Sequence, residues 1–206
     1  QKRIDDPLIN MDIFTSKQFV VGFWASNFLY ASFMGITLIV PLFIENIWGG
    51  TALEAGLVLL PGTIAALFIN PLAGYLTDRF HARPVIVFFG ACLTLGSVAM
   101  AFMDASTPFW LILLLQGIRA CGVSGLVSPL TSWSMEELAP NRMTDASSFS
   151  TAIRQAIASM GTALMVFSIT LGAQAFGSLL FGFQLALGLS GVFALALFVI
   201  ALVRVR

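Results

Sequence analysis

The chain has 206 residues, of which 58% are hydrophobic and only 10% are charged, with ten basic and ten acidic side chains. Soluble globular domains carry about 25% charged residues. The composition therefore excludes a soluble enzyme or nucleic-acid-binding module and indicates a protein of the lipid bilayer. The first residue is Gln1 rather than Met, which favours a piece of a longer protein.

Six segments are apolar enough to cross a bilayer, whose hydrocarbon core of about 30 Å requires roughly 20 helical residues. Residues 1–17 precede them, and we expect these residues to form a cytoplasmic segment between domains. Residues 18–206 are expected to form an all-α, polytopic bundle of six transmembrane helices. The predicted spans are residues 19–45, 53–77, 84–103, 108–135, 146–171 and 182–203.

The basic residues predict the orientation of this bundle, because cytoplasmic loops of membrane proteins carry an excess of Lys and Arg. If the N-terminus is cytoplasmic, the opposite side carries no basic residue, only acids such as Glu45, Glu54 and Asp104. We therefore expect a multi-pass protein of the plasma (inner) membrane with both termini in the cytoplasm. The basic residues on the cytoplasmic side would be Lys2, Arg3, Lys17, Arg79, Arg83, Arg142, Arg204 and Arg206.

Two further arginines, Arg119 and Arg154, lie inside predicted spans. A charge near the bilayer centre costs about 2.5–3.5 kcal/mol on insertion scales. Either these arginines bond to carbonyl groups or a neighbouring helix for packing alone, or they face a water-filled pathway and meet an anion or a moving proton. No Asp or Glu lies deep within any span, so a titrating carboxylate would have to come from outside these residues.

Polar residues accompany the arginines at helical spacing. The fifth span carries serine, threonine, arginine and glutamine on two adjacent faces, and the first and fourth spans carry narrower polar stripes. Small residues in such stripes also allow close helix packing, but three polar stripes together predict a shared polar interior. The candidate cavity residues are Asn27, Tyr30, Met34, Gln116, Arg119, Arg154 and Gln155.

The loop "GYLTDRFHARP" (residues 74–84) joins the second and third spans. Asp78 is expected to end the second span, where the helix dipole disfavours its charge, and the N-terminus of another helix would stabilise it. Gly74 would allow close approach of a helix. This stretch resembles the signature G-x-x-x-D-R-x-G-R-R/K of the major facilitator superfamily. Gly74, Asp78, Arg79 and Arg83 match the signature, whereas His81 stands where the family prefers Gly.

Four further blocks resemble, in order, the last six helices of the superfamily's drug:proton antiporter branch with fourteen helices. The resemblance covers essentially the whole chain and implies that spans one, two, four and five line a cavity between two six-helix halves. It also implies that Asp78 contacts a helix N-terminus of the other half when the cytoplasmic side is closed. The blocks are "DPLINMDIFTSKQF", "AGLVLLPGTIAALFINPLAGYLTDRF", "QGIRACGVSGLVSPLTSW" and "SSFSTAIRQAIASMGTAL".

The residues and the resemblance together predict the C-terminal half of a secondary active transporter, which exports drugs by proton antiport with alternating access. Its partners would be a small drug-like substrate, protons, membrane lipid and an N-terminal transporter half, without cofactor, metal or nucleic acid. Two alternatives stay open: an exporter of an anionic or lipid-like metabolite, and a non-transporting six-helix scaffold or regulatory subunit. An enzyme is not expected, because the spans lack a His cluster, an Asp pair and a GxSxG motif.

Overall fold

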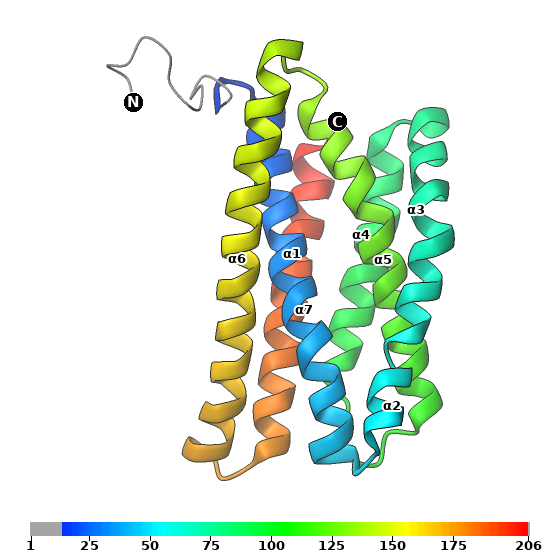
Figure 1. Cartoon of the computed structure of the whole chain (residues 1–206), viewed down its shortest axis with the longest axis vertical. Helices are drawn as coiled ribbons and strands as arrows, with labels where there is room; N and C mark the ends of the chain where they lie inside the picture. Colours follow the sequence, from blue (N-terminus) through cyan, green and yellow to red (C-terminus); the bar gives the residue numbers. More distant parts are fainter. Residues whose placement is uncertain (1–13, 206) are drawn as a thin grey trace.

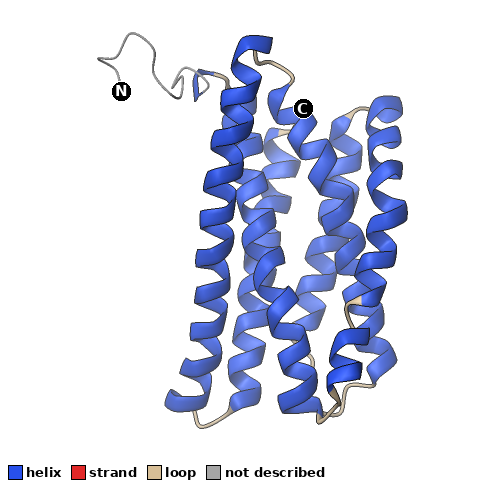
Figure 2. Cartoon of the chain, in the orientation of Figure 1, coloured by secondary structure: helices blue, strands red, loops and turns tan. Residues whose placement is uncertain are grey.

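The computed structural model describes residues 14–205, which form long helices lying side by side and joined by short loops, without a strand (Figures 1 and 2). A π-helical turn, η2, directly continues the first helix. The elements are α1 (Lys17–Phe43), η2 (Ile44–Trp48), α2 (Ala52–Leu57), α3 (Leu60–Phe80), α4 (Ala82–Met100), α5 (Phe109–Met135), α6 (Pro140–Ala175) and α7 (Leu179–Arg204).

Six helical segments in this range are long and apolar enough to cross a membrane, which confirms the predicted all-α bundle of six spans. The second predicted span is interrupted between Leu57 and Leu60. Pro61 explains the break, because a proline has no N–H for the carbonyl four residues earlier and its ring collides with that carbonyl. This carbonyl belongs to Leu57, where α2 ends.

Other boundaries also differ from the prediction. The fifth span begins at Pro140 rather than at residue 146, because a polar stretch extends the helix beyond its apolar part. The second span ends at Phe80, so Asp78 lies within the last turn of α3 rather than ending it. Residues 1–13 of the predicted cytoplasmic segment, with Lys2 and Arg3, lie outside the described residues.

Four helices form the centre of the bundle, with α1 packed on α7, α7 on α4, α4 on α5 and α5 on α1. The remaining two long helices lie on opposite flanks, with α6 against α1 and α7, and α3 mainly against α5 (Figure 1). In their most apolar stretches, 11% of the residues are buried in the α2–α3 span and 22% in the α6 span, against 39–56% in the others. The two flanking spans are thus the ones that the bundle covers least.

Small residues allow the central helices to approach closely. A Cβ atom on Gly96 of α4 would lie 2.9 Å from the backbone nitrogen of Arg119 on α5. Between α1 and α7, the hydroxyl groups of Ser32 and Ser190 are 2.8 Å apart and share a hydrogen bond. Van der Waals packing and interhelical hydrogen bonds are the main attractions between helices in lipid, so these contacts hold the centre together.

Gly96→Ala should destabilise the bundle, because the added methyl group meets backbone atoms that cannot move aside without separating α4 from α5. Overpacking of this kind costs about 1–3 kcal/mol, which lowers a thermal midpoint by about 2–4 °C per kcal/mol. The measurement is thermal unfolding of the purified protein in detergent, followed by circular dichroism.

Gly56→Ala in α2 is the matched control, because a Cβ atom there would have no neighbour within 4 Å. Alanine also favours helix over glycine, so this variant should melt at or above the wild-type temperature. Equal midpoints for Gly96→Ala and the wild type would contradict the tight contact between α4 and α5.

Candidate substrate cavity

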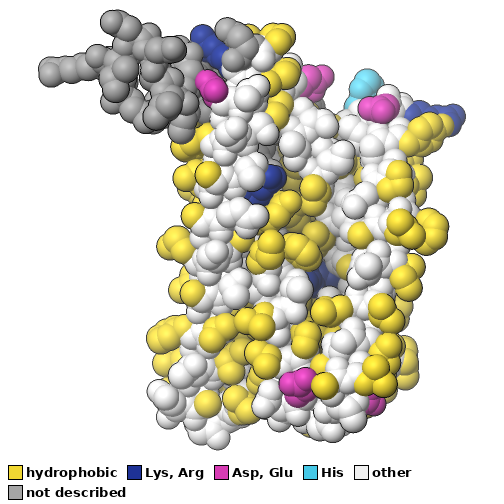
Figure 3. Space-filling model, viewed as in Figure 1, with side chains coloured by type: hydrophobic (Ala, Val, Ile, Leu, Met, Phe, Trp, Pro, Cys, Tyr) yellow, Lys and Arg dark blue, Asp and Glu magenta, His cyan; other side chains and the backbone are white. Residues whose placement is uncertain are grey.

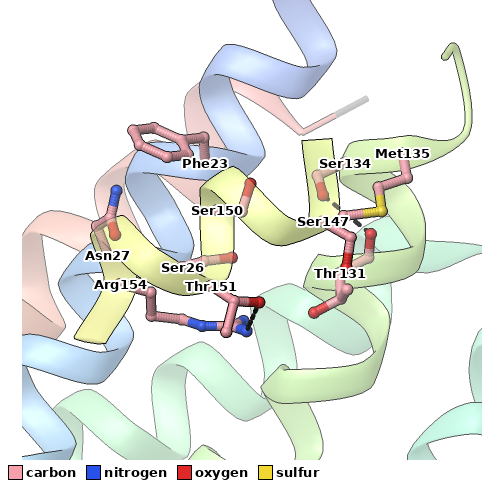
Figure 4. Close-up of a pocket in the computed structure, with 10 residues that line it drawn as sticks. All are labelled: Phe23, Ser26, Asn27, Thr131, Ser134, Met135, Ser147, Ser150, Thr151 and Arg154. Atoms are coloured by element: carbon pink, nitrogen blue, oxygen red, sulfur yellow. Dashed lines mark hydrogen bonds between the residues drawn. The ribbon is translucent and has the colours of Figure 1, made fainter. Parts of the chain in front are cut away.

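Two cavities open on the face of the bundle formed by α6, α1, α5 and α3, which Figure 1 shows in front. The Arg154 cavity lies between α1, α5 and α6 and has a volume of about 20 Å³, room for a single water molecule. Its lining residues, shown in Figure 4, are Phe23, Ser26, Asn27, Thr131, Ser134, Met135, Ser147, Ser150, Thr151 and Arg154.

The Arg119 cavity lies between α1, α3 and α5 and has a volume of about 340 Å³. This volume is within the range of small-molecule binding sites, about 300–1,000 Å³. Its lining residues are Phe33, Thr37, Leu59, Gly62, Thr63, Ala66, Gln116, Arg119, Ala120, Val123 and Ser124.

The guanidinium group of Arg154 has partners on its own helix and on α1. Its Cζ atom lies 4.5 Å from the centre of the Tyr30 ring, and its Nη2 donates a hydrogen bond of 3.2 Å to the hydroxyl of Thr151 (Figure 4). A cation over an aromatic face is stabilised by about 0.5–2 kcal/mol, depending on how far it is desolvated. The charge of Arg154 is therefore held against α1, at the cavity, rather than extended toward lipid.

Asn27 also lines the Arg154 cavity, although it is only 2% exposed. Neither its Oδ1 nor its Nδ2 has a hydrogen-bond partner within residues 14–205. A buried amide without partners carries a desolvation penalty of about 1–3 kcal/mol. The side chain is thus a free donor and acceptor beside the arginine.

Arg119 is even more deeply buried, with 1% of its surface exposed. Its Nε donates a long hydrogen bond of 3.4 Å to Oε1 of Gln116, one turn earlier on α5. Its Nη1 has no hydrogen-bond partner within the described part of the chain. The site therefore combines a cation, an open N–H donor and an adjacent cavity.

The structure brings together part of the predicted cavity set. Asn27 and Arg154 line one cavity, and Gln116 and Arg119 line the other. Tyr30 joins the first group through its ring, which lies under the Arg154 guanidinium. The polar interior that the sequence suggested thus divides into two places on one face of the bundle.

Two predicted residues lie outside both cavities. Met34 is half-buried on α1, and Gln155 is exposed on α6. Gln155 belongs to a polar stripe on α6 with Ser148 and Ser159, which are also exposed at helical spacing. Lipid does not favour such a surface, so this part of α6 is suited to an aqueous space or another protein.

The sequence reasoning missed polar residues of α5. Thr131 and Ser134 line the Arg154 cavity, and Ser124 lines the Arg119 cavity. Together with Gln116 they fall on one helical face, at spacings close to multiples of a turn. This periodicity was available in the sequence and would have identified α5 as the helix shared by both cavities.

The stretch of residues 74–84, in which Gly74, Asp78, Arg79 and Arg83 are expected to form a cytoplasmic gate motif, is almost entirely helical. Only one residue separates its two helices, because α3 ends at Phe80 and α4 begins at Ala82. His81 connects them with φ 68° and ψ 162°, a backbone region that glycine enters freely and other residues enter only with strain. The superfamily signature prefers glycine at this position, and the geometry explains why.

Asp78 and Arg83 line a groove of about 910 Å³ between this loop and the nearby ends of α5 and α6. Arg79 donates a hydrogen bond of 2.9 Å to the Tyr75 hydroxyl. Asp78 is exposed, and no ion pair joins it to another described residue. A Cβ atom on Gly74 would meet nothing within 4 Å, so the helix that this glycine would admit is not found among residues 14–205.

A family model of the Major Facilitator Superfamily matches residues 2–162. The chain belongs to this superfamily. Three curated relatives are similar over most of the chain. The MFS-type transporter YhcA of Bacillus subtilis is 29% identical over 80% of this chain and 31% of its own length. The riboflavin transporter RibZ of Clostridioides difficile is 24% identical over 78% of this chain and 35% of its own length, and the multidrug export protein EmrB of Escherichia coli is 26% identical over 78% of this chain and 31% of its own length.

The fold has a counterpart among solved structures. An auto-inhibited peptide transporter of the POT family matches with a TM-score of 0.71 at 19% identity, over 91% of this chain and 37% of that chain. The chain spans about a third of the length of its curated relatives. It is thus a multi-pass membrane protein of a transporter superfamily, and residues 14–205 contain six helices that can cross a membrane.

His81→Gly should stabilise the turn between α3 and α4, because glycine adopts the observed backbone angles without strain. Relief of such strain is worth about 1–3 kcal/mol, less about 0.5–1 kcal/mol for the greater freedom of glycine in the unfolded chain. We expect a thermal midpoint about 2–4 °C higher in detergent.

Ala82→Gly, one residue later, is the control. Ala82 is helical, so glycine there brings only the entropic cost, and the midpoint should fall. A His81→Gly variant that melts below the wild type, as Ala82→Gly should, would contradict strain at residue 81.

Proposed function

We propose that this chain is the C-terminal half of a multidrug efflux transporter that works by proton antiport with alternating access. The observation that carries the proposal is the polar face of an otherwise apolar bundle, with two arginines on two cavities. The similarity to the multidrug export protein EmrB supports a drug-like substrate. In this proposal the substrate cavity comprises Asn27, Tyr30, Met34, Gln116, Arg119, Arg154 and Gln155.

An N-terminal half of the transporter would cover this face. The poor coverage of α3 and α6 and the exposed polar stripe of α6 support this arrangement. Residues 1–17 would form the cytoplasmic connection to that half. Asp78 would then contact a helix N-terminus of the other half, at the side of Gly74 where no neighbour stands, with Arg79 and Arg83 at the membrane surface.

The distribution of charge supports an orientation with both chain ends in the cytoplasm of a plasma (inner) membrane. The ends of α3 and α7 and the starts of α1, α4 and α6 share one end of the bundle (Figure 1). Among residues 14–205, this end carries the basic side chains that lie outside the centre of the spans (Figure 3). The opposite end carries Glu45, Glu54 and Asp104. Cytoplasmic loops are the basic ones, so the basic end faces the cytoplasm.

Export of an anionic or lipid-like metabolite is the second candidate function. The observation that favours it is the open Nη1 donor of Arg119, and one relative, RibZ, is a riboflavin transporter. A scaffold without transport activity would have little use for a polar face with buried arginines. Competition by anions that is lost in Arg119→Gln or Arg154→Gln would favour the second candidate over drug efflux.

Transport by proton antiport can be tested in inside-out membrane vesicles from cells that express the transporter. An imposed proton gradient, acidic inside, should drive ethidium into the vesicles, and nigericin, which dissipates the gradient, should stop the uptake. Vesicles without the transporter supply the background. Uptake that persists after nigericin would contradict proton coupling.

Arg154→Gln should move the pH dependence of ethidium uptake to higher pH. A nearby guanidinium favours the charged form of a carboxylate by about 1–3 pH units, so a coupling carboxylate in the other half would hold its proton to higher pH in the variant. Arg154→Lys keeps the positive charge and is the matched control. An unchanged profile in Arg154→Gln, at the wild-type amount of protein, would contradict this role.

A further inference from the structure

The charge of Arg119 is not balanced by any acidic group of the described chain. The acidic residues between positions 14 and 205 lie in loops or within about two turns of a helix end. None of them lines the Arg119 cavity. Figure 3 shows the same separation, with Lys and Arg side chains in the middle of this face and acidic side chains at its two ends.

The two arginines of this face differ in how far their own chain satisfies them. Arg154 is half-buried, and both a ring and a hydroxyl contact its guanidinium. Arg119 is 1% exposed, its Nη1 is without a partner in residues 14–205, and its contact with Gln116 is long. A buried charge without a counter-ion is strongly destabilising. Of the two, Arg119 is therefore the arginine that an anion from outside the described chain would stabilise more.

The lining of the cavity indicates the chemistry of that anion. Around Arg119 and Gln116 stand hydroxyl groups from three helices, and the remaining walls are apolar, with Phe33, Leu59 and Val123. The hydroxyls of Thr37 and Thr63 already donate to carbonyls of their own helices. The Nη1 of the Arg119 guanidinium is an open donor within the described residues. It lies at a cavity of about 340 Å³ whose apolar walls suit a hydrocarbon body.

We propose that the Arg119 cavity is a binding site for a carboxylate attached to a small apolar body. A carboxylate matches the fork of N–H donors on a guanidinium. This inference rests on the proposed function in one respect, that the face lines a cavity completed by another half. The carboxylate has two sources, a free aromatic acid that enters the cavity or an Asp or Glu side chain of the other half.

The first experiment measures binding to the purified transporter of 2-naphthoate and of its uncharged analogue 2-naphthamide, by quenching of their fluorescence. The wild type should prefer the acid by about tenfold or more, since a hydrogen bond to a charged group is worth that factor. Arg119→Gln should abolish the preference, whereas Arg204→Gln, an exposed arginine at the end of α7, should retain it. Arg119→Lys should retain a reduced preference, because an ammonium group does not offer the planar fork.

The second experiment distinguishes the source of the carboxylate. A side chain of the other half that pairs with Arg119 would already fill the site, so the wild type would show no preference for naphthoate. Dicyclohexylcarbodiimide, which reacts with protonated carboxyl groups, should then label that half more strongly in Arg119→Gln than in the wild type or Arg204→Gln. The reason is that a carboxylate without its arginine binds a proton more readily.

The proposal is overturned if the wild type shows no preference for the acid and labelling is also the same in Arg119→Gln, Arg119→Lys and the wild type. If Arg119→Gln fails to accumulate, the comparison of Arg119→Lys with Arg204→Gln supplies both readouts. Binding is measured without a proton gradient. A failure of proton coupling would therefore leave the naphthoate result unchanged. A failure of carboxylate binding would in turn leave the result of the ethidium uptake experiment unchanged.

Discussion

A polar group within a bilayer must find its partner inside the protein or in an enclosed aqueous space, because lipid tails offer none. Many polar side chains of this bundle satisfy that condition within their own helix. Thr94 and Thr131, for example, donate hydrogen bonds to carbonyl groups one turn earlier. Three described residues have buried polar atoms without partners: Asn27, Ser97 and Arg119. Nothing in the structure explains Ser97, but the other two line cavities on one face.

This distribution gives the bundle two different sides. Toward α4 and α7 the helices approach through small residues such as Gly96 and through the hydrogen bond between Ser32 and Ser190. Toward α3 and α6 the same centre presents cavities, open donors and an exposed polar stripe. The helices thus pack closely on the side suited to lipid. Two of the three residues with unpartnered polar atoms, Asn27 and Arg119, lie on the side where the proposed second half would lie.

The number and order of the spans could be predicted from sequence, because a run of about 20 apolar residues has few other stable places than a membrane. The break before Pro61 is also predictable, because a proline inside a helical pattern disrupts the hydrogen bond to the carbonyl four residues earlier, here that of Leu57. The early start of α6 does not follow from hydropathy, because residues 141–145 are mostly polar. The signal for it in the sequence is Pro140, since proline is favoured at the first position of a helix. His81 was recognised as a departure from a signature, but its strained backbone follows only from the short turn between two helices.

The candidate site was predictable to the extent that helical periodicity places residues on a face. Periodicity within one helix gives the face on which a side chain lies, but not how deeply the side chain is buried or which residue of another helix it contacts. Met34 and Gln155 therefore share a face with cavity residues and still lie outside both cavities. The contact between Arg154 and Tyr30 depends on how α6 packs across α1. Residue spacing within one helix does not predict how two helices pack against each other. For the same reason the sequence grouped Arg119 with Arg154 as two similar intramembrane charges.

Their surroundings separate the two arginines. Arg154 is half-buried, and its guanidinium contacts the Tyr30 ring and the Thr151 hydroxyl. It can therefore be stabilised whether or not an anion is near. Arg119 has a single long hydrogen bond, to Gln116, and almost no exposure to solvent. Its backbone is held against Gly96 of the rigid centre. A charge fixed in this way cannot move to water when an anion leaves. In a transporter with alternating access, the proposed carboxylate at Arg119 and the conformation of the cavity would therefore be coupled through the cost of leaving that charge unpaired.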